Sequence, residues 1–216
     1  WAYTLTDSNS AVQALAASAT MSDTFAVTSS DGGTSQTITI TITGVNDDAT
    51  FGGATTGGAT EDTSDAAGTA TVADTDTDQS TFTAVSTETA SVSGYGTYTI
   101  TSGGVWAYTL TDSNSVVQAL AADATMTDTF AVTSSDGTSQ TITITITGLN
   151  DAATFAGDIT GAATEDTSDA SGTATVADTD TSQGTFTAVS SAAASVSGYG
   201  TYTITSGGVW AYTLTD

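Results

Sequence analysis

The chain has 216 residues and contains no Lys, Arg, His, Pro or Cys, against 24 acidic residues that give a formal net charge of −24. Because no side chain is positive, no carboxylate can form an ordinary salt bridge, and bound or diffuse cations must relieve the repulsion among them. The charge argues against nucleic acid as a partner, and no apolar run is long enough for membrane insertion. The absence of cysteine excludes disulfide bonds.

The heptapeptide WAYTLTD occurs at residues 1–7, 106–112 and 210–216, so its tryptophans lie 105 and then 104 residues apart. The difference is one glycine, because SSDGGTSQ at residues 29–36 becomes SSDGTSQ at residues 134–140. A period of about 104 residues is the size of a small independent domain. The sequence therefore predicts an array of such domains.

Two linkers, GVNDDAT and GLNDAAT, mark the boundaries, because a Thr/Ile-rich run ends there and polar residues begin. They predict the C-terminal part of a sandwich repeat at 1–44, a complete repeat at 45–148 and the N-terminal part of a further repeat at 149–216. We interpret the chain as a window cut from a longer tandem protein. The alternative is that partial repeats of different chains complement each other by donor-strand assembly, although this would supply WAYTLTD twice.

Alternation of polar and apolar residues predicts β-strands along each period. In TITITIT, residues 141–147, the three isoleucines fall on one face of a strand. Similar runs separated by Gly, Asp and Ser turns predict an all-β fold of antiparallel β-sandwiches joined end to end. The strands expected in the complete repeat are 49–55, 68–73, 81–86, 95–101, 105–111, 128–134 and 139–147.

Between the strands at 105–111 and 128–134, Val116, Val117 and Leu120 recur at helical spacing. They predict a short helix behind Ser113 or Asn114 as its N-cap. The sequence SGG at 102–104 predicts a tight hairpin turn, since glycine adopts the positive φ that such turns need. The expected core consists of the large apolar residues of the strands, Trp106, Tyr108, Leu110, Phe130, Val132, Ile142, Ile144 and Ile146.

The acidic residues are clustered in the linkers, in the TEDTSD segments and in the ADTDT segments. Carboxylate and amide oxygens at alternate positions of a loop are hard donors that suit a cation such as Ca²⁺. Strands that alternate in direction bring these segments to the domain boundaries. One junction is expected to gather Asn46, Asp47, Asp74, Asp76 and Asp78. The next is expected to gather Glu61, Asp62, Asp112, Asn150, Asp151, Asp178 and Asp180, and Glu165 and Asp166 repeat the acidic pair.

The opposing interpretation is that these Asp and Asn residues only form turns and keep the surface soluble. We favour a metal site because the chain offers no cation to neutralise converging carboxylates. Three acidic residues and their copies are instead expected to be turn residues or solvated charges. They are Asp7, Asp65 and Asp136.

The same motifs run in one order through each period: TED, ADTDT, GYGTYTI, GGVWAYTL, VQALAA, DTFAVTSSDG and ITITITG followed by a residue and Asn-Asp. The combination resembles the VCBS-type repeats of giant bacterial surface adhesins, which belong to the cadherin-like and immunoglobulin-like sandwiches. The resemblance implies tandem extracellular domains on a bacterial cell surface or secreted, with Ca²⁺ at their junctions. The proline that such repeats usually carry after Asn-Asp-Ala is absent here.

The resulting hypothesis is a structural segment of a long extracellular adhesin or filament, stiffened by calcium, whose partners are neighbouring repeats and like chains. One alternative is a glycan- or surface-binding module that uses Tyr95, Tyr98 and Trp106, although strand spacing favours the core for Trp106. Another is a self-assembling fibre subunit, because the strands carry few charges at their edges. An enzyme is not expected, since without His, Cys, Lys or Arg the chain has no usual general base near neutral pH, no nucleophile activated by one and no oxyanion-stabilising cation.

Overall fold

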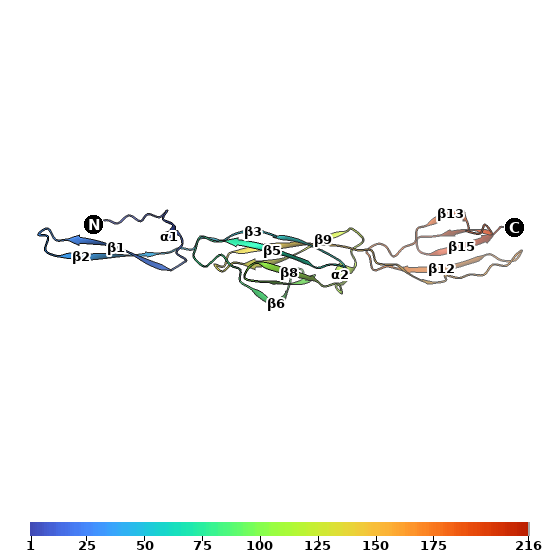
Figure 1. Ribbon diagram of the computed structural model, residues 1–216. Helices are drawn as coiled ribbons and strands as arrows, with labels where there is room; N and C mark the ends of the chain where they lie inside the picture. The colour runs from blue at the N-terminus through green and yellow to red at the C-terminus, as the bar shows by residue number, and fades with distance from the viewer. Residues whose placement is uncertain (216) are drawn as a thin grey trace. The chain divides into compact units, whose positions relative to one another are not determined.

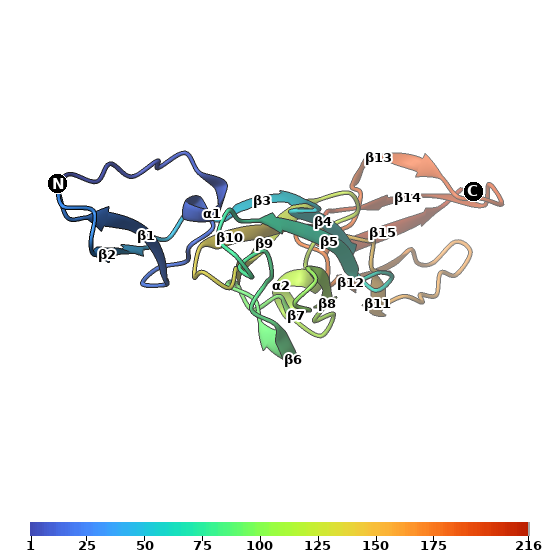
Figure 2. The same cartoon turned by 60° about the vertical axis from the view of Figure 1, so that its left-hand side comes forward.

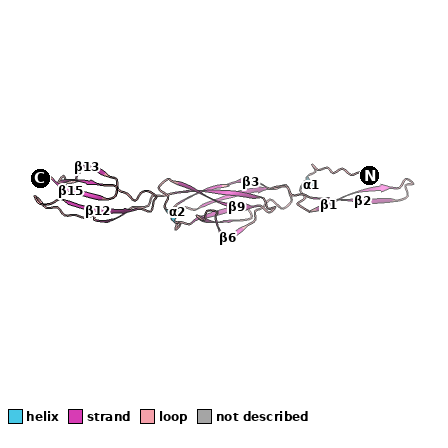
Figure 3. Cartoon of the chain, turned by 180° about the vertical axis from the view of Figure 1, so that it is seen from behind, coloured by secondary structure: helices cyan, strands magenta, loops and turns pink. Residues whose placement is uncertain are grey.

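The computed structural model describes residues 1–215, and their regular structure is nearly all β-strand (Figure 3). This confirms the all-β class. The helices of the described chain are single turns, α1 (Ser10–Gln13) and α2 (Ser115–Gln118). The strands are β1 (Thr20–Thr28), β2 (Ser35–Thr43), β3 (Thr50–Gly53), β4 (Thr56–Thr60), β5 (Ala66–Ala73), β6 (Val85–Ala90), β7 (Gly96–Ile100), β8 (Val105–Leu110), β9 (Thr125–Thr133), β10 (Ser139–Thr147), β11 (Thr154–Gly157), β12 (Ala170–Ala177), β13 (Val189–Ala194), β14 (Gly200–Ile204) and β15 (Val209–Leu214).

The described chain divides into two compact units. Unit 1 consists of residues 1–59, 64–110 and 127–145, and unit 2 consists of residues 60–63, 111–126 and 146 onward. Unit 1 contains the antiparallel hairpin β1-β2, a five-stranded sheet and most of a three-stranded sheet (Figure 1). Unit 2 contains a second five-stranded sheet.

Two sheets of unit 1 form a β-sandwich. The five-stranded sheet has the order β3-β5-β8-β7-β6 with antiparallel neighbours, and the three-stranded sheet has the order β4-β10-β9. Phe130 of β9 joins them, because its ring stacks on Tyr98 of β7 and meets Trp106 of β8 edge-on, with ring centroids 4.3 and 5.8 Å apart. The predicted core is confirmed by burial of Trp106, Tyr108, Leu110, Phe130, Val132, Ile142, Ile144 and Ile146.

Trp106 lies at the centre of this core with an exposed fraction of 0%. Its indole Nε1 donates a hydrogen bond to the carbonyl oxygen of Ala54 at 2.8 Å, so the polar edge of the ring is satisfied. Gly57 of β4 makes room for the ring, since a Cβ there would lie 2.6 Å from the indole. The burial of Trp106 also overturns its use as an exposed sugar platform.

The structure differs from the sequence prediction where the chain passes between sheets. The strand expected at 49–55 is broken at Gly53, whose φ is +72°, and the chain continues as β4 in the other sheet. The strand expected at 81–86 starts later, as β6 from Val85, because Phe82 forms a bridge with Ser134 instead. Period-two alternation does not reveal such changes of partner, since the pattern is the same in both sheets.

The turns follow the sequence more closely. Gly104, with a φ of +83°, closes the β7-β8 hairpin, as SGG predicts. Helix α2 starts after Asn114, whose side chain accepts a hydrogen bond from the backbone N–H of Val116 at 2.9 Å. Val117 of this helix is fully buried, whereas Val116 is exposed.

The sheet of unit 2 repeats the design of the five-stranded sheet of unit 1. Its order is β11-β12-β15-β14-β13, again with antiparallel neighbours (Figure 2). Tyr202 lies opposite Tyr212, as Tyr98 lies opposite Tyr108 in unit 1. Equal sequences therefore give the same register in both units.

A buried carboxylate completes the sandwich of unit 1. Asp128 of β9 is 1% exposed and accepts hydrogen bonds from the Tyr108 hydroxyl at 2.9 Å, from the backbone N–H of Ser93 at 3.0 Å and of Tyr95 at 3.3 Å, and from the Ser91 hydroxyl. Burial raises the pKa of Asp128, but the hydrogen bonds outweigh it and hold the pKa below the ordinary 3.8. The charge is thus stabilised without any cation.

The substitution Asp128→Asn is expected to lower the free energy of unfolding by about 1–3 kcal/mol. The amide NH₂ group would face the buried N–H and O–H groups that now donate to the carboxylate. Because the folded-state pKa is lowered, the stabilisation is present above pH 3.8 and is lost as the pH falls through the folded value. Denaturant titrations at neutral and acid pH measure both effects. Asp23→Asn, the same change at the exposed copy on β1, serves as the control and is expected to cost less than about 0.5 kcal/mol.

Candidate functional site

The first acidic cluster consists of Asn46, Asp47, Asp74 and Asp76, and it lies in unit 1. The backbone N–H of Asp47 donates to Oδ2 of Asp76 at 3.0 Å, and the backbone N–H of Asp76 donates to Oδ1 of Asp74 at 2.8 Å. Asp76 is 2% exposed. The structure therefore brings the linker at 46–47 against the acidic loop that follows β5, as the sequence predicts for these four residues.

Asp136 also holds this linker, a role that the sequence analysis missed. Its Oδ2 accepts hydrogen bonds from the backbone N–H of Ala49 at 3.2 Å and from Nδ2 of Asn46 at 3.4 Å. The Ser134 and Thr138 hydroxyls also donate to it, so its pKa is lowered despite desolvation. Strand direction is the signal that finds it, because the loop between β9 and β10 lies at the same end of the sandwich as the linker.

The second acidic cluster lies in unit 2 and consists of Glu61, Asp62, Asp112, Asp151, Asp178 and Asp180. Asp151, Asp178 and Asp180 repeat the first cluster. The backbone N–H of Asp151 donates to Oδ2 of Asp180 at 3.1 Å, and that of Asp180 donates to Oδ1 of Asp178 at 2.9 Å. Asp180 is 2% exposed, like its copy Asp76. The same loop geometry thus forms at both linkers.

Glu61 distinguishes the second cluster, because its side chain is 0% exposed. Its Oε2 accepts a hydrogen bond from the backbone N–H of Leu149 at 3.0 Å, whereas its Oε1 is buried without a hydrogen-bond partner. Burial raises the pKa of Glu61 above the ordinary 4.5, and the nearby charges of Asp151, Asp62 and Asp180 add to this rise. Glu61 is therefore a buried acid surrounded by like charges.

Asp62 and Asp112 complete the second cluster. The backbone N–H of Asp62 donates to Oδ1 of Asp112 at 3.2 Å, and Nε2 of Gln118 donates to Oδ1 of Asp62 at 3.0 Å. Asp62 has a φ of +56° and is exposed, as is Asp112. Three stretches of chain, around residues 61, 112 and 150, therefore meet in unit 2.

A threonine at each linker makes a contact that involves no carboxylate. In unit 1 the backbone N–H and the hydroxyl of Thr77 both donate to the carbonyl oxygen of Ala14, at 3.1 and 2.9 Å. In unit 2 Thr181 makes the same two bonds to Ala119, at 3.0 and 2.8 Å. We call each pair a threonine clasp. It links the acidic loop to the segment just after helix α1 or α2.

The remaining predicted ligands are exposed. Asp78 is exposed in a left-handed turn with a φ of +64°, and its copy is Ser182. Asn150 is exposed, and its Nδ2 donates to the carbonyl oxygen of Asp151 at 2.6 Å. Glu165 and Asp166 are exposed.

Buried oxygen atoms without hydrogen bonds test whether a cation fits these clusters. They are Asp74 Oδ2 and Asp76 Oδ1 in the first cluster, and Glu61 Oε1, Asp151 Oδ2 and Asp180 Oδ1 in the second. Such atoms cost free energy unless a positive group meets them, and the chain has no positive side chain. Within residues 1–215 no three acidic side chains alone form a metal-binding group, so backbone and amide oxygens or water would have to complete a ligand set. The donor set fits a hard cation on these terms.

Residues 46–148 match the family model of the bacterial cadherin-like domain. The match supports a cadherin-like repeat over these residues. Among solved structures, the chain is similar to the crystal structure of the protocadherin GammaB4 extracellular domain, with a TM-score of 0.40 and 11% sequence identity over 89% of this chain. The similarity covers 36% of that protein, so this chain spans about a third of its length. A search of curated proteins gives no match.

Neutralising the buried acid by Glu61→Gln is expected to stabilise the cation-free protein at pH 7 by about 1 kcal/mol, because it removes an unpaired buried charge. The sign follows from the raised pKa of Glu61. Its charged form destabilises the folded state above the folded pKa, and this cost is relieved as the pH falls toward 4.5. Acidification is therefore expected to reduce the difference in stability between the wild-type protein and the Glu61→Gln variant. Thermal unfolding in EDTA at pH 7 and pH 5 measures this. Glu165→Gln, at the exposed copy, is the control, and a destabilised Glu61→Gln variant would contradict the assignment.

Removing one bond of a clasp by Thr181→Val is expected to cost about 0.5–1.5 kcal/mol, since the backbone bond to Ala119 remains. The loss is expected to be equal with and without calcium, because the clasp uses no carboxylate. Unfolding curves in EDTA and in excess calcium provide the measurement. Thr179→Val, at the exposed threonine of the same loop, is the control and should leave both curves unchanged.

Proposed function

We propose that this chain is a segment of a long extracellular structural protein of bacteria, built from VCBS-type repeats and stiffened by Ca²⁺ at the linkers between them. Its immediate partners are the neighbouring repeats of the same chain. The segment acts as a stalk or filament that carries an adhesive part away from the cell surface. The match of residues 46–148 to the bacterial cadherin-like domain supports an extracellular, adhesion-type repeat.

The burial of Glu61 carries the calcium part of this proposal. A carboxylate with an exposed fraction of 0% has one oxygen on the Leu149 backbone and the other on no partner, with Asp62, Asp151 and Asp180 nearby. In a chain without Lys, Arg or His, only a bound cation can supply the missing positive charge. Calcium suits the site because it accepts six to eight oxygen ligands in flexible geometry.

The residues that would hold the ion are the clustered acids. In unit 1 they are Asp47, Asp74 and Asp76, with Asn46, and in unit 2 they are Glu61, Asp62, Asp112, Asp151, Asp178 and Asp180, with Asn150. The bound ion would neutralise the mutual repulsion of these groups and join oxygen atoms from separate stretches of the chain. The acidic loops are already oriented for this, because backbone N–H groups of residues 47 and 151 hold Asp76 and Asp180 in place.

At each linker, some contacts of the chain stabilise the position of the acidic loop and others destabilise it. The threonine clasps and the hydrogen bonds of Asp76 and Asp180 position the acidic loops without any ion. The buried unpartnered oxygens oppose this arrangement at neutral pH. We infer that the linkers are held weakly in the absence of calcium and firmly in its presence.

No helix within residues 1–215 is long and apolar enough to cross a membrane. The net charge of −24 would also be repelled by anionic lipid.

Calcium is expected to stabilise and extend the protein. At a free concentration of about 100 times the dissociation constant, one site contributes about 2.7 kcal/mol to the free energy of unfolding. For a chain of this size, each 1 kcal/mol raises Tm by about 2–4 °C. Calorimetry and small-angle X-ray scattering with EDTA and with excess calcium measure the two effects, and native mass spectrometry counts the ions bound.

Two variants sharpen the calcium test. Glu61→Gln should remove part of the calcium-dependent gain, whereas Glu165→Gln should keep all of it. Magnesium at the same concentration should give a smaller gain, since it demands a tighter octahedral set of ligands. Equal melting temperature and equal extension with and without calcium would refute the proposal.

A further inference from the structure

Strands β4 and β10, near the start and at the end of the cadherin-like segment at 46–148, are directly hydrogen-bonded to each other in the three-stranded sheet. The backbone N–H of Thr143 donates to the carbonyl oxygen of Thr55 at 3.1 Å. The backbone N–H of Glu61 donates to the carbonyl oxygen of Thr147 at 3.0 Å. The residue numbers on the two strands increase together, so β4 and β10 run parallel. We call them the terminal pair.

The two linkers meet the terminal pair at its opposite ends. Before the start of β10, Asp136 accepts a hydrogen bond from the backbone N–H of Ala49, so the first linker lies at that end. After the end of β4, Glu61 accepts a hydrogen bond from the backbone N–H of Leu149, so the second linker lies at the other end. Tension applied through the two linkers therefore pulls β4 and β10 in opposite directions along their own axes.

Tension of this kind loads the hydrogen bonds of the terminal pair in shear. The bonds of a parallel pair are evenly spaced along the strands, so they share the load and must break nearly together before the strands can slide. Strands that are pulled apart from one end lose their bonds one after another, each at a small force. The parallel arrangement thus resists tension better than a hairpin that is opened from its ends.

The inner side of the terminal pair is closed to water. Ala59 of β4 is 1% exposed, and Ile144 and Ile146 of β10 are 0% exposed. Gly57 lies against the indole of Trp106 with no room for a Cβ, so β4 packs closely on the core. Backbone hydrogen bonds in such buried, densely packed elements open least readily by local unfolding.

The strand break at Gly53 connects the loaded segment to both sheets. Before the break, β3 pairs with β5 of the five-stranded sheet, where Thr50 lies opposite Ala73. After the break, the backbone N–H of Ala54 donates to the carbonyl oxygen of Thr69 at 2.8 Å, and the chain continues as β4 beside β10. Tension at the first linker therefore reaches both sheets of the sandwich.

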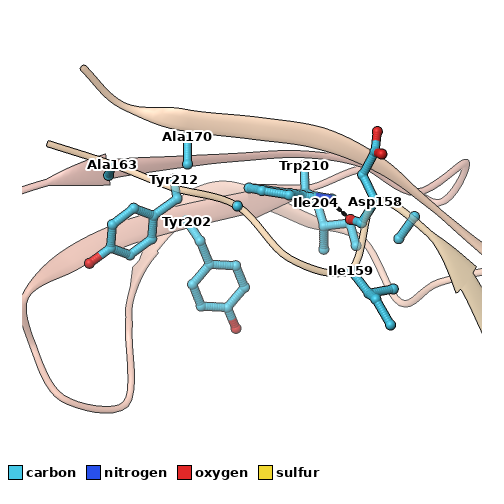
Figure 4. Close-up of a pocket in the computed structure, with 10 residues that line it drawn as sticks. Asp158, Ile159, Ala163, Ala170, Tyr202, Ile204, Trp210 and Tyr212 are labelled. Atoms are coloured by element: carbon cyan, nitrogen blue, oxygen red, sulfur yellow. Dashed lines mark hydrogen bonds between the residues drawn. The ribbon is translucent and has the colours of Figure 1, made fainter.

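Unit 2 shows the copy of β4 without a strand of the β10 type beside it. The segment TGGA at 56–59 becomes TGAA at 160–163, and these copied residues form no strand. A cavity of about 550 Å³ lies there, and Figure 4 shows Ile159 and Ala163 of this segment near Trp210. The strand form of the segment thus occurs where β10 lies beside it.

We propose that the terminal pair is a mechanical clamp, which keeps the cadherin-like segment folded while the chain is under tension. The clamp rests on the proposed function, because a stalk that is held at both linkers carries tension along its length. It consists of backbone hydrogen bonds and apolar packing, so it acts with or without a bound cation. The proposed calcium sites stiffen the linkers, whereas the clamp resists unfolding of the repeat itself.

Single-molecule force spectroscopy in two pulling directions tests the clamp. The chain has no cysteine, so DNA handles can be attached to introduced cysteines of the full-length chain. Val45→Cys with Leu149→Cys loads the terminal pair in shear, whereas Val45→Cys with Ser139→Cys loads it from one end, and all three positions are exposed. At one loading rate, the unfolding force is expected to be severalfold higher in shear. The released chain should approach about 3.3–3.6 Å for each residue between the handles.

Two substitutions measured in the shear direction separate the clamp from general stability. Thr143→Pro removes the N–H that donates to Thr55 and should lower the unfolding force. Val117→Ala shortens a buried side chain of α2, outside the terminal pair, and should lower the midpoint of denaturant unfolding while the unfolding force stays nearly unchanged. The two readouts differ because forced unfolding follows the rate of unfolding and not the equilibrium stability.

All measurements are made in EDTA and in calcium. The difference between the pulling directions is expected in both, so a failure of the calcium proposal would leave it unchanged. If Thr143→Pro does not fold, the two pulling directions of the otherwise unchanged chain decide alone. Equal unfolding forces in the two directions, or an equal loss of force in Thr143→Pro and Val117→Ala, would overturn the clamp.

Discussion

The absence of any positive side chain is the constraint on which the rest of this structure depends. Every carboxylate that leaves the surface must find donors on the backbone, on hydroxyl groups or on a cation from solution. Asp128 and Asp136 find theirs within the chain, and their pKa values are lowered accordingly. Glu61 does not, and its pKa is raised. The contrast separates acids that stabilise the sandwich from an acid with one buried oxygen that has no hydrogen-bond partner.

The placement of these acids relates fold to function. The satisfied carboxylates belong to the strands and turns of unit 1, whereas the unpartnered buried oxygens belong to the acidic loops and to Glu61. A cation at the loops would therefore act on the linkers and leave the sandwich core largely unaffected. The two threonine clasps act at the same places through uncharged groups, so each linker has a contact that the proposed cation would not affect.

The sequence allowed much of this to be predicted, because strict repetition and period-two alternation identify strands, turns and the core. Trp106, Phe130 and the isoleucines are buried as expected, and Asn114 caps α2. The break at Gly53 and the late start of β6 were missed, because alternation does not tell a strand which sheet it joins. Asp136 was missed although strand direction places its loop beside the linker. The clasps were missed because they depend on loops meeting in space, which spacing along the chain does not encode.

The additional glycine of the β1-β2 loop changes how the aspartate at its tip is held. In unit 1 the backbone N–H of Thr138 and its hydroxyl both bind Asp136, the residue that grips the linker. In the longer loop the corresponding Asp31 is held by the backbone N–H of Gly33, which has no hydroxyl to offer. A single inserted residue thus replaces a threonine that bonds the tip aspartate through two groups by a glycine that bonds it through one. The length of this loop therefore sets how many hydrogen bonds fix the aspartate at its tip.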